Sequence, residues 1–346
     1  MSIPQRFGEG PPPLTIGIEE ELAICDARTL EQVGRVDAIL GGLDGRRLPG
    51  RAKTELHASV FELNTEPCAT AGEALEALVE LRRAAAEAAA SAGLAVAATG
   101  SHPLAVSEEQ PIVQEERYLA MVAHHGVSAL HQDVQGLHVH LAMPSGEDCW
   151  RVLEGLLPWL PVVLAVSANS PWVAGRLTGM ASNRAPALAE LPRTGAPPPL
   201  GSYAAWEAWV EELVALGVID DYTWIWWDVR PHPGLGTLEV RVPDQPTDVR
   251  RSAAIAAALQ ALAGRLLLAG EVAVADRGHY EQNRWAAARF GPAAELVVPG
   301  GGRLATAAEL AREGLGLDLD GSEAELQARF GDPREAVADL VARSVA

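Results

Sequence analysis

Short segments in which apolar and polar residues alternate place the strongest restriction on how this chain folds. They are residues 14–25, 54–66 and 134–143, followed by 222–230 and 237–242 on either side of the sequence PHPGLG. A period of two is typical of half-buried strands, because successive side chains point to opposite faces of a sheet. We therefore expect these segments to form strands, with residues 54–66 forming a strand, a tight turn and a second strand, and with the last two segments forming a hairpin.

The remaining ordered segments have the composition of helices. Ala and Glu dominate residues 71–92, and helices are also expected over 147–168, over 204–216 and through most of the chain after about residue 248. Strands and helices do not follow a regular βαβ rhythm. The sequence therefore predicts an α+β fold, with one antiparallel sheet and helices packed on its outer face.

Two stretches are predicted to be irregular. Residues 1–13 are rich in Gly and Pro, which predicts a flexible N-terminal segment ahead of a single domain over residues 14–346. Residues 170–202 are rich in Pro, Gly, Ser and Arg and show no periodicity. A long loop inside a compact domain is usually functional, so we expect this one to form a lid over a site.

Composition argues against several classes of partner. The 346 residues include 46 Asp and Glu but only 27 Lys and Arg, a net charge of −19, so neither nucleic acid nor an anionic membrane is expected as a partner. Three cysteines without CxxC spacing disfavour a disulfide scaffold and a structural zinc site. No signal peptide is recognisable, and the most apolar run, residues 156–168, is too short to span a bilayer. These features predict a cytoplasmic protein.

The polar faces of the predicted strands collect acids, histidines and arginines. The even positions of residues 14–24 are mostly apolar, so Glu19 and Glu21 project together from the other face. The same reasoning pairs His138 with His140 and Glu239 with Arg241, and it adds Glu55, Glu62, Asn64, Asp228 and Arg230 from the other strands. One such pair is typical of a solvated strand. Together in one sheet, these strands would form a face crowded with carboxylates and bordered by arginines.

Such a face requires cations, because neighbouring carboxylates repel one another. Carboxylate and imidazole ligands suit Mg²⁺ or Mn²⁺, and magnesium in such sites is usually completed by water and substrate phosphates. Arginines beside the carboxylates suit phosphate binding. The chain has no GxxxxGK[ST] loop and no GxGxxG after a strand. The residues therefore predict a metal–nucleotide site for phosphoryl transfer, built from metal ligands and arginines.

Taken together, the motifs resemble the glutamate–cysteine ligase superfamily, most closely its second branch, the bacterial carboxylate–amine ligases. The resemblance runs from about residue 14 to 290, and seven motifs in order make it specific. The matching segments are Gly17-Ile18-Glu19-Glu20-Glu21; Glu55 with Phe61-Glu62-Leu63-Asn64-Thr65-Glu66-Pro67; Gly136-Leu137-His138-Val139-His140; Ser167-Ala168-Asn169-Ser170-Pro171; Gly175-Arg176 with Thr178-Gly179, Ser182 and Arg184; Trp226-Trp227-Asp228-Val229-Arg230-Pro231; and Gly236-Thr237-Leu238-Glu239-Val240-Arg241.

This resemblance implies a glutamine-synthetase-like fold, in which a curved antiparallel sheet holds the metals. It implies an ATP-dependent ligase that forms an amide bond through an acyl phosphate and releases ADP and phosphate. The implied Mg²⁺ ligands, with Mn²⁺ as the alternative ion, are Glu19, Glu21, Glu55, Glu62, His138 and Glu239. Arg241 is implied as the γ-phosphate arginine, Arg230 as a further catalytic arginine, and Arg176 and Arg184 as residues of the substrate loop.

Other implications of the resemblance are less specific. The segment Asn283-Arg284-Trp285 resembles a later family motif, which implies a place for Asn283 and Arg284 in the nucleotide pocket, although a plain amphipathic helix is the favoured interpretation of that segment. The loop departs from the family at Leu177, Met180 and Asn183, which leaves the substrates open. Glutamate and cysteine are the family's default pair of small-molecule substrates, and a homodimer is compatible with the sequence. A metal-dependent phosphate-ester hydrolase and a non-catalytic binding module remain as alternatives.

Overall fold

A single antiparallel sheet of seven strands confirms the α+β class. The computed structural model describes residues 3–319 and 321–345. The strand order is β10-β11-β5-β1-β3-β2, and β4 pairs with the far end of β1. Their bounds are β1 Ile16–Asp26, β2 Gly50–Thr54, β3 Val60–Thr65, β4 Leu94–Ala97, β5 Leu137–Ala142, β10 Val229–His232 and β11 Thr237–Val240.

The predicted apolar rows form the core side of this sheet. Ile18 on β1 lies opposite Val139 on β5, which in turn lies opposite Val240 on β11, and all three are 0–1% exposed. Branched side chains suit this position, because they pack well on a pleated surface. Burial of this row fixes the register, since a slip of one residue would turn each strand's apolar set to the other face.

A pair of substitutions on β5 tests the two faces separately. Val139→Ala is expected to lower the free energy of unfolding by about 1–3 kcal/mol, through lost burial and the cavity left behind. His138→Ala, one residue away on the opposite face, should lower it much less while greatly reducing turnover. Urea unfolding and steady-state assays of both variants measure this. Equal losses of stability would contradict the assignment of the faces.

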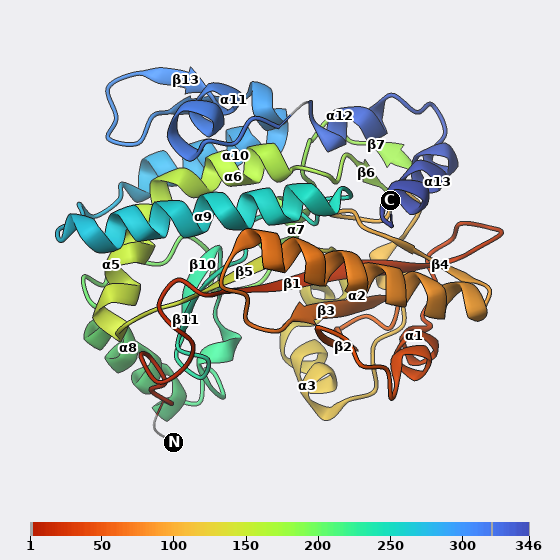
Figure 1. Cartoon of the computed structure of the whole chain (residues 1–346), viewed down its shortest axis with the longest axis horizontal. Coiled ribbons are helices and arrows are strands. Elements are labelled where there is room, and N and C mark those ends of the chain that lie inside the picture. Colours follow the sequence, from red (N-terminus) through yellow and green to blue (C-terminus); the bar gives the residue numbers. More distant parts are fainter. Residues whose placement is uncertain (1–2, 320, 346) are drawn as a thin grey trace.

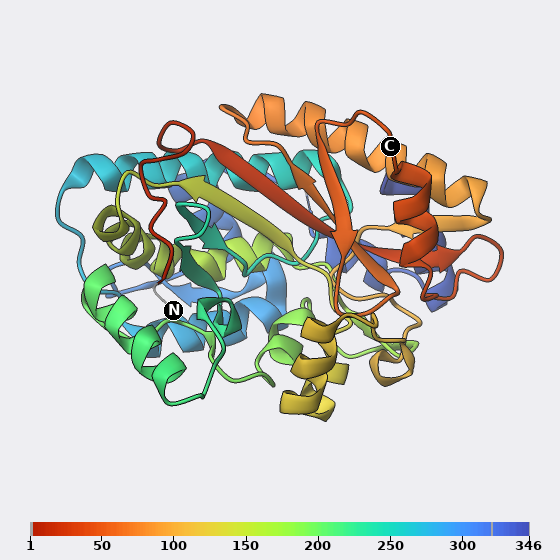
Figure 2. The same cartoon turned by 90° about the horizontal axis from the view of Figure 1, so that it is seen from below.

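Four helices cover the core side of the sheet. They are α2 (Ala71–Ser91), α5 (Gly146–Leu156), α6 (Leu160–Ser167) and α9 (Val249–Ala269). In Figure 1, α2 and α9 run across the sheet, and Figure 2 shows both on the same side of it. The expected helix over 147–168 is interrupted by a 3-10 turn, Leu157–Trp159, at Pro158. Proline lacks the amide hydrogen that a continuous α-helix needs there.

Two expected strand boundaries were wrong. The first strand of the 54–66 hairpin lies earlier, at Gly50–Thr54, so Glu55 follows the strand instead of belonging to it. This edge strand has no buried residue and hence no apolar row that could mark it in the sequence. In the 222–230 segment, Tyr222–Trp224 is a 3-10 turn, and β9 (Trp226–Trp227) pairs in parallel with β8 (Thr194–Gly195) outside the main sheet.

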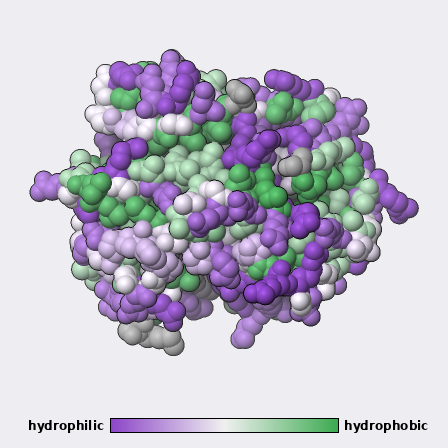
Figure 3. All heavy atoms as spheres, viewed as in Figure 1, coloured by the Kyte–Doolittle hydropathy of each residue, from purple (hydrophilic) through white to green (hydrophobic). Residues whose placement is uncertain are grey.

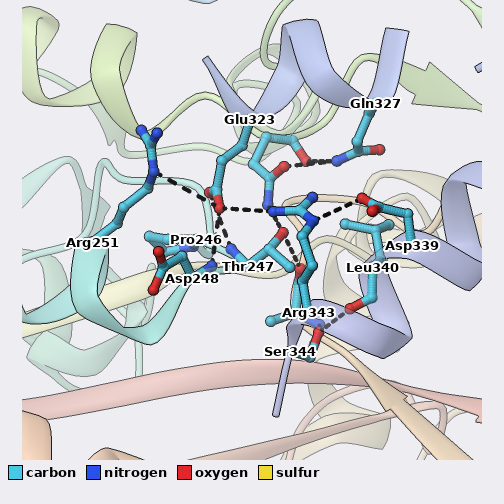
Figure 4. Close-up of polar contacts among 12 residues, drawn as sticks. Pro246, Thr247, Asp248, Arg251, Glu323, Gln327, Asp339, Leu340, Arg343 and Ser344 are labelled. Carbon is cyan, nitrogen blue, oxygen red and sulfur yellow. Dashed lines mark hydrogen bonds and ion pairs between the residues drawn. The ribbon is translucent and has the colours of Figure 1, made fainter. Parts of the chain in front are cut away.

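Residues near the C-terminus fasten the sheet to its covering helices. Helix α12 (Glu323–Ala328) presents the buried carboxylate of Glu323, which accepts hydrogen bonds from the backbone amides of Thr247 and Asp248 at the start of α9 (Figure 4). Arg343 of α13 (Pro333–Arg343) approaches the same carboxylate at 3.6 Å. This region, whose role the sequence leaves open, therefore binds the start of α9.

Residues 3–13 make contacts that their composition does not indicate. The amides of Arg6 and Gly8 donate to the carbonyls of Pro233 and Met143, and the ring of Phe7 meets that of Tyr203 edge-on. Tyr203 lies in α8 (Tyr203–Ala215) and donates its hydroxyl hydrogen to Gln5. The segment therefore packs along the β10–β11 side of the sheet. We call residues 3–13 the docked N-terminal strap.

Two helical segments are long and apolar enough to cross a membrane by composition alone. They are residues 146–167, whose most apolar window is 78% buried, and α9, whose window is 44% buried. Figure 3 shows apolar side chains over the middle of the face where α9 crosses in Figure 1, with hydrophilic residues around them. Core helices pass the same test of composition, so these segments are weak evidence for a membrane.

Candidate active site

A cavity of about 240 Å³ opens on the polar side of the sheet. The predicted residues Glu19, Glu21, Glu55, Glu62, His138, Arg184, Arg230, Glu239 and Arg241 all line it. A second cavity of about 330 Å³ shares Glu19 and His140 with the first. The two cavities thus meet at the acidic centre of the sheet.

The antiparallel register brings these side chains together in rows. Glu19 lies opposite both His138 and Asn64, and Glu21 lies opposite Glu62. Glu239 lies opposite His140 on one side, and opposite Arg230 on the other. Alternation along each strand puts every second residue on the same face, so the rows stack directly beside one another. Predicted and observed faces therefore agree for β1, β3, β5 and β11.

Two groups of three side chains could each hold a cation, and His138 belongs to both. One group joins Glu19 and Glu239 to His138, and the other joins Glu21 and Glu62 to His138, with ligand atoms within 4.8 Å of one another. Nε2 of His138 is buried without a hydrogen-bond partner among the described residues, although Glu21 approaches it at 3.7 Å. Buried polar atoms normally have a partner, so this nitrogen is suited to bind a metal ion. Hard carboxylates with one imidazole suit Mg²⁺ or Mn²⁺.

The pKa values of the side chains in this cluster reflect their burial and the closeness of several carboxylates. Burial, and then the neighbouring Glu62, raises the pKa of Glu21 to about 7. Burial, and then Glu19 and Glu55, raises the pKa of Glu62 well above its ordinary value. Burial, with Arg241 nearby, lowers the pKa of His138 to about 3 and keeps the imidazole neutral, which is the form that binds metals.

Glu239 lies between two guanidinium groups. Arg230 donates to it from Nε at 2.7 Å, and Arg241 donates to its other oxygen. Burial alone would raise the pKa of Glu239, but Arg230 and Arg241 hold it well below its ordinary value. Both arginines line the cavity beside the cation groups, which is the arrangement that phosphate binding needs.

Arg184 donates its side-chain hydrogen bonds to the backbone, and its positive charge lowers the pKa of the nearby Glu21. It donates to the carbonyls of Val242 and Arg241, at 3.2 and 3.1 Å, and its guanidinium lies against Gly136. A Cβ atom at Gly136 would come within 2.1 Å of that group, so a larger residue there would displace the guanidinium. Two residues of the 170–202 stretch expected as a lid are fixed to the fold, since Asp244 accepts hydrogen bonds from Ser170 and Ser182, whereas residues 176–179 are exposed.

Three predicted site residues lie outside the cavity. Arg176 is exposed on β7 (Arg176–Leu177). Asn283 and Arg284 lie on α10 (Arg277–Phe290), where Asn283 exchanges hydrogen bonds with Val297 and Arg284 pairs with Asp228 at 2.5 Å. These contacts fit the amphipathic-helix interpretation. They also turn Asp228 away from Arg230, with which the strand pattern had grouped it.

Other cavity residues were not among the predicted metal ligands and arginines. Lys53, the chain's only lysine, lies opposite Glu62 and pairs with it at 2.9 Å. His140 and His232 lie in the cavity with their rings 5.6 Å apart. Its outer wall includes Arg117 and Tyr118 from α3 (Glu116–His125). The alternation around residue 138 was a signal for His140, whereas residues 116–125 carry no strand pattern or matching motif.

Comparison with known proteins places this geometry in a family. The sequence matches the model of glutamate–cysteine ligase family 2 over residues 15–343. A Rubrobacter xylanophilus protein, provisionally named glutamate–cysteine ligase 2-3, is 40% identical over 327 residues, which cover 93% of this chain and 89% of that protein. A Herpetosiphon aurantiacus protein, provisionally named glutamate–cysteine ligase 2, is 36% identical over 82% of this chain and 75% of that protein.

Solved structures share the fold at low sequence identity. Glutamate–cysteine ligase from Francisella tularensis, solved in complex with AMP, gives a TM-score of 0.68 at 15% identity, over 96% of this chain and 88% of that chain. A bifunctional glutathione synthetase from Pasteurella multocida gives a TM-score of 0.58 at 16% identity, over 96% of this chain and 50% of that chain. These superpositions agree with the glutamine-synthetase-like sheet that the motifs implied.

Proposed function

Because the chain belongs to glutamate–cysteine ligase family 2, we propose that its cavity joins a carboxylate to an amine at the expense of ATP. The observation that carries this proposal is Glu239, which lies between Arg230 and Arg241 and also belongs to one of the two cation groups. A terminal phosphate bound there would meet a metal ligand and two guanidiniums at once. The family match favours this ligase over the phosphate-ester hydrolase and the non-catalytic module.

Different cavity residues would carry out different parts of the proposed reaction. Bound Mg²⁺ would neutralise phosphate charge as the γ-phosphoryl group moves to the substrate carboxylate. Glu19, Glu21, Glu62, Glu239 and His138 would hold the ions, with Glu55 beside Glu62. Arg241 and Arg230 would bind the transferring group, and Arg184 would add positive charge from its fixed position. The acyl phosphate formed in this way would react with the amine and release phosphate.

The same proposal extends to the substrates, the cellular setting and the oligomeric state of the protein. Glutamate and cysteine are the first pair to test, since the relatives are provisionally named glutamate–cysteine ligases. Two cavities that meet at Glu19 and His140 would give two substrates separate approaches to the centre. Three free, buried cysteines fit a reducing, cytoplasmic setting. A homodimer is a further proposal, which light scattering of the purified chain tests.

A substrate screen tests the proposed reaction directly. Carboxylate and amine pairs, beginning with glutamate and cysteine, are incubated with ATP and Mg²⁺, and the nucleotide and amide products are identified by mass spectrometry. We expect ADP, phosphate and one amide in equal amounts. ADP release that needs no amine, and gives no amide, would instead indicate a phosphatase or a hydrolase.

Metal dependence provides a test that is independent of turnover. Mg²⁺ at 100 times its dissociation constant is expected to stabilise the fold by about 2.7 kcal/mol, because a bound cation relieves the repulsion among the acids. His138→Ala should abolish most of this gain, because both cation groups share that residue. His279→Ala, on the surface of α10, is the matched control. Differential scanning calorimetry with Mg²⁺ or with excess chelator measures the shift, and equal shifts in all three proteins would contradict the metal site.

A further inference from the structure

The side chain of Arg184 is a buried part of the cavity wall, and its backbone begins a very short helix. Arg184 is 2% exposed and lines the cavity. The helix that it begins, α7 (Arg184–Leu188), has five residues, and a helix of this length is not stable by itself. The position of the Arg184 side chain therefore depends on the contacts that hold the start of α7.

The amides at the start of α7 donate to acceptors outside the helix. Asn183, the residue before the helix, makes no capping hydrogen bond with its side chain. Instead, the amide of Arg184 donates to the hydroxyl oxygen of Ser170 at 3.2 Å. The amide of Ala185 donates to the hydroxyl oxygen of Ser182, also at 3.2 Å. Amides in the first turn of a helix have no acceptor within it, so these two hydroxyls serve as its cap.

A buried carboxylate orients both hydroxyls. Asp244 is fully buried, and its two oxygens accept the hydroxyl hydrogens of Ser170 at 2.6 Å and of Ser182 at 2.8 Å. A hydroxyl has one hydrogen, so a serine that donates it to Asp244 leaves its lone pairs for other donors. Those donors are the amides of α7. The amide of Asn169 also donates to Asp244, at 2.9 Å, which fixes the carboxylate in turn.

The segment that holds α7 also carries Arg241. Asp244 follows Arg241 by three residues, and the guanidinium of Arg184 donates to the carbonyl of Arg241 at 3.1 Å. One short segment therefore holds Arg184 twice, at its backbone through the two serines and at its side chain directly. Burial lowers the pKa of Arg184, and the negative charges of Glu21 and Asp244 oppose this effect. Asp244 thus acts on Arg184 both by hydrogen bonding and by charge.

The carboxylate and the two serines do not themselves face the site. Asp244, Ser170 and Ser182 are fully buried and do not line the cavity, whereas Arg184 does. Any effect of these three residues on a reaction in the cavity would therefore pass through Arg184. We propose, on the basis of the proposed ligase function, that Asp244 is a positioning residue, which holds Arg184 in place for catalysis through Ser170 and Ser182.

Kinetics of the serine variants test this assignment. Ser170→Ala combined with Ser182→Ala is expected to lower kcat about 10- to 100-fold, because a displacement of about 1 Å in a cavity group can cost this much. The KM for ATP should change much less, since the metal ligands are unchanged. Ser252→Ala is the matched control, because its hydroxyl is fully buried and donates to Glu20 at 2.6 Å, outside the cavity. A kcat no lower than that of the control would overturn the proposal.

A double-mutant cycle with Arg184 separates positioning from a general loss of stability. Arg184→Ala alone is expected to lower kcat about 10²- to 10³-fold. Removal of both serine hydroxyls in the Arg184→Ala enzyme should lower kcat no further, because the group that they position is already absent. Asp244→Asn, which has only one acceptor oxygen, should behave in the same way. Losses that add to that of Arg184→Ala, or full kcat in Asp244→Asn, would overturn the proposal.

Hydrogen exchange at Nε of Arg184 provides a measurement that does not need turnover. NMR of isotope-labelled protein, with the signal assigned from Arg184→Lys, should show slow exchange with water in wild type and in Ser252→Ala, because the side chain is buried. The double serine variant should exchange this hydrogen about 10-fold faster, since α7 then opens more readily. Exchange as slow as in wild type would overturn the proposal.

The two proposals fail in different ways. Amide synthesis by wild type, with kcat and exchange in the double serine variant equal to those of Ser252→Ala, would overturn the role of Asp244 and leave the ligase function in place. Conversely, wild type could make no amide while exchange at Arg184 is faster only in the double serine variant. That result would overturn the ligase function and support the positioning of Arg184 by Asp244.

Discussion

Replacing Arg241 with lysine is expected to lower kcat by about 10²- to 10³-fold, the usual effect of losing one electrostatic contact to a transition state. Arg241 and Arg230 both bind Glu239, and a lysine in place of Arg241 could not contact this carboxylate and a phosphoryl group with the same fork. Steady-state assays with the substrate pair found by screening measure the effect. Arg312→Lys, an exposed substitution far along the chain, is the control.

Identifying the nucleotide product, ADP or AMP, adds a second measurement to this test. A cluster built around the terminal phosphate should release ADP and phosphate, and wild type and Arg241→Lys should give the same products at different rates. Release of AMP and pyrophosphate during amide formation would discard the acyl-phosphate mechanism. Full activity in Arg241→Lys would remove Arg241 from the catalytic step while leaving the ligase assignment intact.

Replacing Arg82 with methionine is expected to lower the free energy of unfolding by about 3–5 kcal/mol. Arg82 of α2 binds Glu20 of β1 through two hydrogen bonds, of 2.6 and 2.7 Å, and neither side chain is more than 3% exposed. The substitution leaves the buried carboxylate of Glu20 without its positively charged partner on the core side of the sheet. Urea unfolding of Arg82→Met measures the loss.

Two further variants distinguish the effect of burial on stability from the effect of ion pairing alone. Arg46→Met removes a surface ion pair with Glu87 and should lower the free energy of unfolding by about 1 kcal/mol at most. Glu20→Gln combined with Arg82→Met should be less destabilised than Arg82→Met alone, because no charge is left unpaired. Equal losses in Arg82→Met and Arg46→Met would show that Glu20 is reached by water or is protonated in the fold.

Local periodicity explains why much of the site could be predicted. Glu19, Glu21, His138 and Glu239 each alternate with apolar residues that must be buried, so the face of each side chain follows from its own strand. The position of Glu55 could not be predicted as well, because β2 is an edge strand without a buried row. Residues on loops and helices, such as Arg176 and Arg284, lack this constraint, and in the structure they lie outside the cavity.

Long-range pairing explains most of what the sequence could not indicate. Glu20 is an acid in an apolar row, and only the fold shows that Arg82, 62 residues later, neutralises it. Helix α3 has no motif of its own, and its place over the cavity depends on Thr54 and Trp224 from distant segments. The docked N-terminal strap likewise depends on Tyr203, which lies about two hundred residues away.

The fastening of the C-terminal region to the sheet also bears on how the protein is made. Arg82 donates to the carbonyl of Ser344 across 262 residues, and the amide of Ala98 donates to its hydroxyl across 246. A nascent chain emerging from the ribosome therefore carries both donors long before their acceptor exists. Contacts of such sequence separation slow folding and leave apolar surface exposed in the interval. Removal of Ser344 would thus take away the acceptor of the buried Ala98 amide and one of the several acceptors of Arg82.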